Sequence, residues 1–131
     1  ALAARNWRVA IAETNTAGKI AERLRARPEG SRIIKSAMLL ANVSDVSEQN
    51  AVAVAEQFRK ATGADIAVAA LGTMQAEHGL YSAETGRTAI AVATEKETRK
   101  MAYSVGGTGD HAQSWIITRA LDLLRRAASR N

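Results

Sequence analysis

A cluster of hydroxyl, amide and glycine residues follows an acid near the start of the chain. Residues 12–18 have the sequence AETNTAG, and a helical pattern begins within this segment. The backbone N–H groups of Thr16, Ala17 and Gly18 are then expected at a helix N-terminus. Such groups can hold a phosphate, a carboxylate or the oxyanion of an acyl-transfer intermediate. Because Gly18 has no side chain, it would let a ligand approach the backbone closely.

Two interpretations of this segment are open from the residues alone. In the first, Glu13, Thr14 and Asn15 join the three N–H donors in a binding or catalytic site. In the second, the segment is only a tight turn in which a polar side chain caps the helix and Glu13 pairs with an arginine. The AGK sequence at residues 17–19 is not a phosphate-binding P-loop, because the first glycine of that motif is missing.

A second polar stretch follows a later apolar run. Residues 64–72 are almost entirely apolar, and Gly72, Thr73 and a polar loop to residue 86 come directly after them. Ligands of open α/β sheets bind at the carboxyl ends of the strands. We therefore expect Gly72 and Thr73 to lie beside the first cluster, with His78 and Tyr81 of the loop nearby.

The elements that would position these residues alternate along the chain. Apolar runs predict strands at 7–13, 32–41, 64–72, 87–94 and 99–105, and 3.6-residue periodicity predicts helices at 17–26, from about 47 to 62, and from 110 onward. Ser44 or Ser47 can cap the second helix and Gly63 can end it. Asp110 and Gln113 have the spacing of a capping box for the third.

This β-α-β-α-β-β-β-α order predicts a three-layer α/β sandwich with a mixed, mainly parallel sheet. The run at 32–41 is long and apolar enough for a central strand, but Lys35 and Ser36 interrupt it. Lys35 is therefore either at a sheet edge or in a functional position. At 131 residues, we expect the chain to be one domain, 1–131.

The composition excludes several classes of site. There is no cysteine and there are two histidines, so we expect no metal site and no cofactor. No apolar stretch approaches the ~20 residues of a membrane span, and no signal peptide opens the chain, so the predicted location is the cytoplasm. The net charge of +5 comes with only 4% aromatic residues, so we do not expect nucleic-acid binding. A basic surface can also attract an anionic small molecule.

The ordered set of segments resembles the CinA C-terminal domain family, which includes the nicotinamide-nucleotide amidases. The resemblance rests on AETNTAG at 12–18, GSRIIKSAMLL at 30–40, the run from VSEQN to AALG at 46–72, GRTAIAVAT at 86–94 and ALDLLRR at 120–126. It implies a homo-oligomer that hydrolyses the carboxamide of nicotinamide mononucleotide with a serine nucleophile, activated by nearby Tyr and Lys residues.

The chain departs from the family motif at the chemistry. Thr14 stands in the place of the serine, Asn15 in the place of a cysteine, and Ala17 in the place of the first glycine. The segment LLANVSDVSEQ at 39–49 offers neither the Tyr nor the Lys that the family has after its second strand.

Two functional hypotheses follow. In the first, the chain is an amide hydrolase of small amides or nucleotides, in which Thr14 is the nucleophile and the base is Lys35, Glu77, His78 or Tyr81. In the second, it is an inactive CinA-like domain that binds a nucleotide or a partner protein. The substrate-binding residues expected in the first hypothesis are Glu13, Asn15, Thr16, Ala17, Gly18, Gly72 and Thr73.

Overall fold

The computed structural model describes residues 2–28, 30–40, 43, 45–73, 86–106 and 109–129. The strands are β1 (Val9–Glu13), β2 (Ile34–Leu39), β3 (Ile66–Gly72), β4 (Thr88–Thr94) and β5 (Thr98–Tyr103). The helices are α1 (Leu2–Arg5), α2 (Lys19–Arg25), α3 (Gly30–Ile33), α4 (Glu48–Thr62) and α5 (Asp110–Ser129). The predicted order of strands and longer helices is confirmed, and two four-residue helices, α1 and α3, are added to it.

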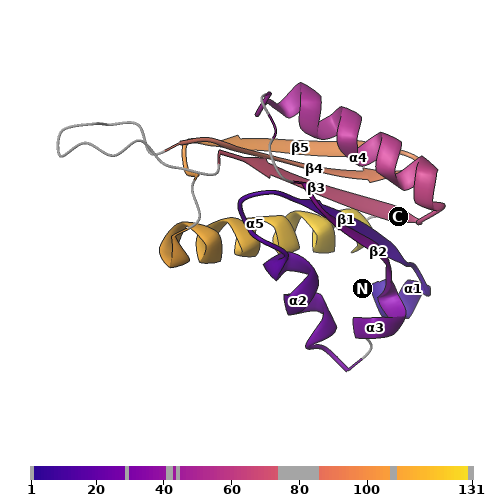
Figure 1. The fold of residues 1–131 in the computed structure, drawn as a ribbon. Coiled ribbons are helices and arrows are strands. Elements are labelled where there is room, and N and C mark those ends of the chain that lie inside the picture. The colour runs from indigo at the N-terminus through magenta and orange to yellow at the C-terminus, as the bar shows by residue number, and fades with distance from the viewer. Residues whose placement is uncertain are drawn as a thin grey trace, which may run out of the picture.

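The strands form one mixed sheet in the order β2-β1-β3-β4-β5. β1 pairs in parallel with both β2 and β3, whereas the β3–β4 and β4–β5 pairs are antiparallel. Helix α4 covers one face of the sheet, and α5 and α2 cover the other (Figure 1). The predicted three-layer α/β sandwich with a mixed sheet is therefore confirmed.

The two faces of the sheet carry side chains of different size. The face toward α2 and α5 carries branched residues such as Ile11, Val68 and Ile90, which are fully buried with Ile20 and Ile116 of the two helices. The face toward α4 carries mainly alanines, all fully or nearly fully buried. Those on β3 and β4 are Ala67, Ala69, Ala89, Ala91 and Ala93. Ala51 and Ala55 of α4 meet this surface, so small side chains face each other across the layer.

The strand predicted at 32–41 is an edge strand and not a central one. β2 pairs with β1 alone, and Leu39 is 62% exposed. Its pairing shifts between Val9 and Ala10, where Lys35 is the extra residue opposite β1. Lys35 is exposed at this irregularity. Of the two positions expected for Lys35, a sheet edge or a functional site, the structure places it at the sheet edge.

The caps predicted for α4 are confirmed. Ser47 is the N-cap, its hydroxyl accepting from the Asn50 N–H, and Gly63 is the C-cap in the left-handed conformation (φ 73°). Ser44, the other predicted cap, lies outside the described residues. None of the helices described is both long enough and apolar enough to cross a membrane.

The capping box predicted at the start of α5 is wrong. Gln113 does not return to Asp110; its side chain is 3% exposed and contacts the β1–α2 turn instead. The buried residues of α5 are Gln113, Ile116, Ile117, Ala120, Leu124, Ala127 and Ala128.

Candidate functional site

Glu13, the last residue of β1, caps α2 from inside the protein. Glu13 is 2% exposed, and its carboxylate accepts the N–H groups of Ile20 at 3.0 Å and Ala21 at 3.1 Å, as well as the hydroxyl of Thr16. These two N–H groups belong to the first turn of α2, whose N-cap residue, Gly18, has no side chain to supply. The carboxylate therefore occupies donors that an anionic ligand would otherwise use.

Thr14 is held against the end of β3. Its side chain is buried, and its Oγ1 accepts the N–H of Gly72 at 2.7 Å. The acceptors within reach of its own proton are oxygen atoms of Asn15, Ala70 and Gly72, at 3.2–3.3 Å. None of these carbonyl or amide oxygens can take a proton as a general base.

Asn15 is also fully buried, and Gly72 makes room for it. Its Nδ2 donates to Oγ1 of Thr88 at 3.3 Å. A Cβ atom built on Gly72 would lie 2.3 Å from Oδ1 of Asn15. The absence of a side chain at Gly72 is thus required by the buried position of the Asn15 amide.

One of the three predicted N–H donors is already used within the turn. Ala17 N–H donates to the carbonyl of Thr14 at 3.1 Å, and α2 begins at Lys19, two residues later than predicted. Ala17 is exposed and has a left-handed backbone (φ 55°), and Gly18 has a φ of 83°. Two consecutive residues with positive φ therefore form the turn, and its polar side chains are buried in the protein.

The structure brings only part of the predicted site together. Gly72 lies beside Thr14, whereas Thr73 pairs with Arg87 at the base of the following loop, its N–H donating to the Arg87 carbonyl at 2.9 Å. Lys35 lies opposite the start of β1, four to five residues from Thr14 along the strand, which is roughly 15 Å. The structure therefore does not bring Lys35 to Thr14.

The remaining predicted bases, Glu77, His78 and Tyr81, lie outside the described residues. In the part of the chain that the structure describes, no group of three or more His, Asp or Glu side chains is placed to hold a metal ion.

Gln113 of α5 contributes to the site but was missed as a site residue. Its Nε2 donates to the carbonyl of Asn15 at 2.8 Å, and its Oε1 accepts from Nζ of Lys19 at 2.7 Å. A signal was present in the sequence, because Gln113 has the spacing of the apolar stripe that continues through Ile116, Ile117 and Ala120. A polar side chain on such a stripe indicates a buried hydrogen-bonded partner.

An open groove runs between α2 and α5 next to this contact. We call it the α2–α5 groove; its volume is about 490 Å³, and Lys19, Glu22, Arg23, Asp110, Gln113 and Ile117 are among the residues that line it. Thr14, Asn15 and Thr16 are themselves buried, whereas Gln113 of the groove contacts the carbonyl of Asn15, so the groove adjoins the turn.

Comparison with known proteins identifies relatives along nearly the whole chain. The model of the CinA C-terminal domain matches residues 35–128, which begin after the turn that carries Thr14. A CinA-like protein of Anaeromyxobacter dehalogenans is 34% identical over 143 residues, which cover 96% of this chain and 35% of that protein. A CinA-like protein of Koribacter versatilis is 31% identical over 139 residues, which cover 93% and 34%. The chain therefore spans about a third of the length of these relatives.

Solved structures show the same fold. The competence damage-inducible protein A of Klebsiella pneumoniae superposes with a TM-score of 0.84 at 22% identity, covering 98% of this chain and 91% of that chain. A competence/damage-inducible protein of Agrobacterium tumefaciens superposes with a TM-score of 0.77 at 21% identity, covering 95% and 87%. On the family match and the sequence identity together, this chain belongs to the CinA C-terminal domain family.

Proposed function

We propose that this chain is a CinA-like domain that binds a small anionic molecule of the nucleotide class in the α2–α5 groove, without hydrolysing it through Thr14. The observation that carries the proposal is that the Thr14 hydroxyl is buried and hydrogen-bonded within the protein. Thr14 is 1% exposed, and its hydroxyl oxygen accepts the Gly72 N–H at 2.7 Å. A nucleophilic hydroxyl needs its oxygen directed at the substrate and a base within hydrogen-bond distance of its proton.

The accessible charges of the groove support an anionic ligand. Lys19 and Arg23 lie four residues apart on α2, so they lie on the same side of the helix, and Gln113 orients the Lys19 ammonium. These cations suit a phosphate, which Lys contacts as a point charge and Arg through a planar fork. Glu22 and Asp110 on the rim can accept hydrogen bonds from the hydroxyl groups of a sugar.

Ligand-induced thermal stabilisation tests the binding. Nicotinamide mononucleotide, its riboside, AMP and inorganic phosphate would be titrated into the wild-type protein, Lys19→Ala, Arg23→Ala and the matched control Arg25→Ala. Arg25 is an exposed cation of the same helix that does not line the groove. We expect stabilisation by the phosphate-bearing ligands that Lys19→Ala and Arg23→Ala weaken and Arg25→Ala leaves unchanged. An absence of stabilisation, or equal stabilisation of all variants, would contradict the proposal.

Amide hydrolysis with Thr14 as the nucleophile is the second candidate function. Its support is the position of the Thr14 hydroxyl, directly after Glu13 at the carboxyl end of β1, where ligands of α/β sheets bind. Ammonia release from the same ligands and from small amides would be measured with wild type, Thr14→Ser and Thr14→Val. Release that is retained in Thr14→Ser and lost in folded Thr14→Val would establish the hydrolase and overturn our first proposal.

A further inference from the structure

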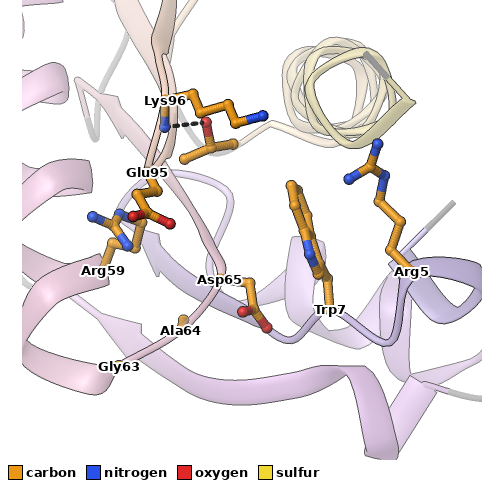
Figure 2. Close-up of a pocket in the computed structure, with 9 residues that line it drawn as sticks. Arg5, Trp7, Arg59, Gly63, Ala64, Asp65, Glu95 and Lys96 are labelled. Carbon is orange, nitrogen blue, oxygen red and sulfur yellow. Dashed lines mark hydrogen bonds between the residues drawn. The ribbon is translucent and has the colours of Figure 1, made fainter. Parts of the chain in front are cut away.

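A second pocket lies at the other end of the sheet from Thr14. It has a volume of about 280 Å³ and lies where β1 and β3 begin and β4 ends; we call it the Trp7 pocket. Figure 2 shows the residues that line it, among them Arg5, Trp7, Arg59, Asp65, Glu95 and Lys96. Since β3 has seven residues, roughly 20 Å of strand separates this pocket from the turn at Thr14.

The end of α1 fixes Trp7 in place. Asn6 has a left-handed backbone (φ 59°), and the Trp7 N–H donates to the carbonyl of the buried Leu2 at 2.9 Å. The partly buried indole packs against the core, and the guanidinium carbon of Arg5 lies over one face of the ring, 4.6 Å from its centroid. In Figure 2 Arg5 stands on one side of the ring, and Asp65 and Lys96 stand on the other. The indole therefore turns its second face into the pocket.

Charges of both signs surround this aromatic face. Arg5, Arg59 and Lys96 contribute positive charge, and Asp65 and Glu95 contribute negative charge. The ion pairs formed by the described residues, Arg99–Glu97, Arg125–Asp122 and Arg126–Asp122, all lie outside the pocket. The charges that line it are thus not neutralised by one another through a direct ion pair.

Backbone contacts hold two of these charges in position. Oδ2 of Asp65 accepts the Arg8 N–H at 2.9 Å, which orients the carboxylate and leaves Oδ1 as its second acceptor. Oγ1 of Thr94 accepts the N–H groups of Lys96 at 3.3 Å and Glu97 at 3.1 Å, which fixes the turn that carries Lys96. Asp65 and Lys96 are therefore presented by ordered turns on two different elements.

We propose that the Trp7 pocket binds an aromatic α-amino acid as its zwitterion. The ring would stack on the open face of Trp7, the ammonium group would face Asp65, and the carboxylate would face Lys96 and Arg59. A purely anionic ligand would meet the carboxylates of Asp65 and Glu95, and a purely cationic ligand would meet Arg59 and Lys96. The volume lies just below the roughly 300–1,000 Å³ of drug-sized pockets, which suits a ligand as small as a free amino acid.

Calorimetric titration of the full chain tests this assignment. L-Phenylalanine is the probe. Three comparison ligands each lack one feature: glycine lacks the ring, phenethylamine lacks the carboxylate, and 3-phenylpropionate lacks the ammonium group. We expect phenylalanine to bind at least about fivefold more tightly than each of the three, since stacking and charged hydrogen bonds each add to affinity. Equal affinity for any one of them would overturn the assignment, as would an absence of phenylalanine binding.

Variants locate the binding and keep the test independent of stability. Trp7→Ala, Asp65→Asn and Lys96→Ala should each weaken phenylalanine binding about fivefold or more. Trp115→Ala is the matched control, because Trp115 is the other tryptophan and lies against Tyr103, outside the pocket. Asp65→Asn retains an acceptor for the Arg8 N–H, so a folding defect in Trp7→Ala would leave two informative variants. Unchanged binding in both would overturn the proposal, whereas Lys19→Ala reports only on the α2–α5 groove.

Discussion

At the scale of single residues, the polar side chains of the β1–α2 turn are bonded to the protein itself. Glu13 accepts two backbone N–H groups of α2, and Thr14 accepts one from β3. These bonds offset the cost of burying the polar groups, because an unpartnered buried donor or acceptor costs about 1–3 kcal/mol. The polarity of the turn is explained by its folding into the interior, independently of any ligand.

The backbone of Ala17 is in a conformation that favours glycine. Its φ of 55° places it in the left-handed region, which costs a residue with a Cβ about 1–2 kcal/mol. Ala17 is exposed, so Ala17→Gly removes no packing. Glycine avoids the cost of the left-handed conformation, but the larger conformational entropy that it loses on folding offsets part of this gain. We expect Ala17→Gly to raise the free energy of unfolding by up to about 1 kcal/mol in urea titrations. Ala26→Gly, at an exposed site with a φ of −70°, should lower it instead; destabilisation by Ala17→Gly would contradict the prediction.

The contact between Gly72 and Asn15 predicts a coupled pair of mutations. Gly72→Ala places a Cβ within 2.5 Å of three atoms of the Asn15 side chain, which is fully buried. We expect Gly72→Ala to destabilise the fold by about 1–3 kcal/mol through overpacking.

Replacing Asn15 should remove this conflict. In a double-mutant cycle measured by urea denaturation, Gly72→Ala should cost clearly less in an Asn15→Ala background, with a coupling of at least about 0.5 kcal/mol. Additive effects of the two substitutions would show that the two side chains do not compete for the same space.

At the scale of elements, the alanine face of the sheet sets the packing of α4. Ala91 is fully buried in the cluster that includes Ala51 and Ala55 of α4. Ala91→Leu should therefore destabilise the protein by about 1–3 kcal/mol, because well-packed interiors resist added volume. Ala102→Leu, at an exposed position of the neighbouring strand β5, is the matched control. Equal stability of the two variants in denaturant titrations would contradict this account.

The end of α5 carries a charge cluster with a predictable pH dependence. The hydrogen bond from Arg125 holds the pKa of Asp122 below its ordinary value, against an opposing effect of burial, with the nearby charges of Arg126 and Arg119 lowering it further. A carboxyl whose pKa is lower in the folded state stabilises the fold above its ordinary pKa. That stabilisation is lost as the pH falls through the lower, folded-state pKa.

Asp122→Asn should accordingly lower the melting temperature slightly at neutral pH and have no effect in strong acid. Added salt should reduce the difference at neutral pH, since exposed ion pairs are screened. A difference between wild type and variant that persists unchanged in acid would show that the carboxylate charge is not responsible.

At the scale of the whole molecule, Gln113 ties the last helix to the first turn. Residues 98 positions apart in sequence are joined by its bond to Asn15, and its second bond reaches Lys19 of α2. Gln113→Leu places an apolar side chain on the stripe and removes both hydrogen bonds. We expect it to cost about 1–3 kcal/mol in free energy of unfolding and to speed hydrogen exchange in α2. Ser114→Ala, an exposed neighbour on α5, should change neither; an effect as large as that of Gln113→Leu would contradict the prediction.

The two pockets also belong to this scale, because they lie at opposite ends of the same sheet. The α2–α5 groove adjoins the carboxyl end of β1, and the Trp7 pocket lies where β1 begins. Among the described residues, the two pockets have no lining residue in common, so variants of one pocket serve as controls for the other.

The sequence by itself determined the element order, the family and most of the core. Alternating apolar runs and periodic stretches are local signals, and Ser47 and Gly63 bound α4 through local backbone chemistry. The apolar run at 66–72 is buried on both faces, as its composition predicts. The resemblance to the CinA C-terminal domain also followed from ordered segments that can be compared without coordinates.

Only the tertiary structure decided which polar groups of the turn remain available. Whether Glu13 faces a ligand or caps α2, and whether Lys35 approaches Thr14 or lies at a sheet edge, depends on strand order and register. Gln113 matched a local capping pattern, but its partners come from residues nearly a hundred positions away. Hydrogen-bond partners and burial arise from contacts between distant segments, and these contacts exist only once the chain has folded.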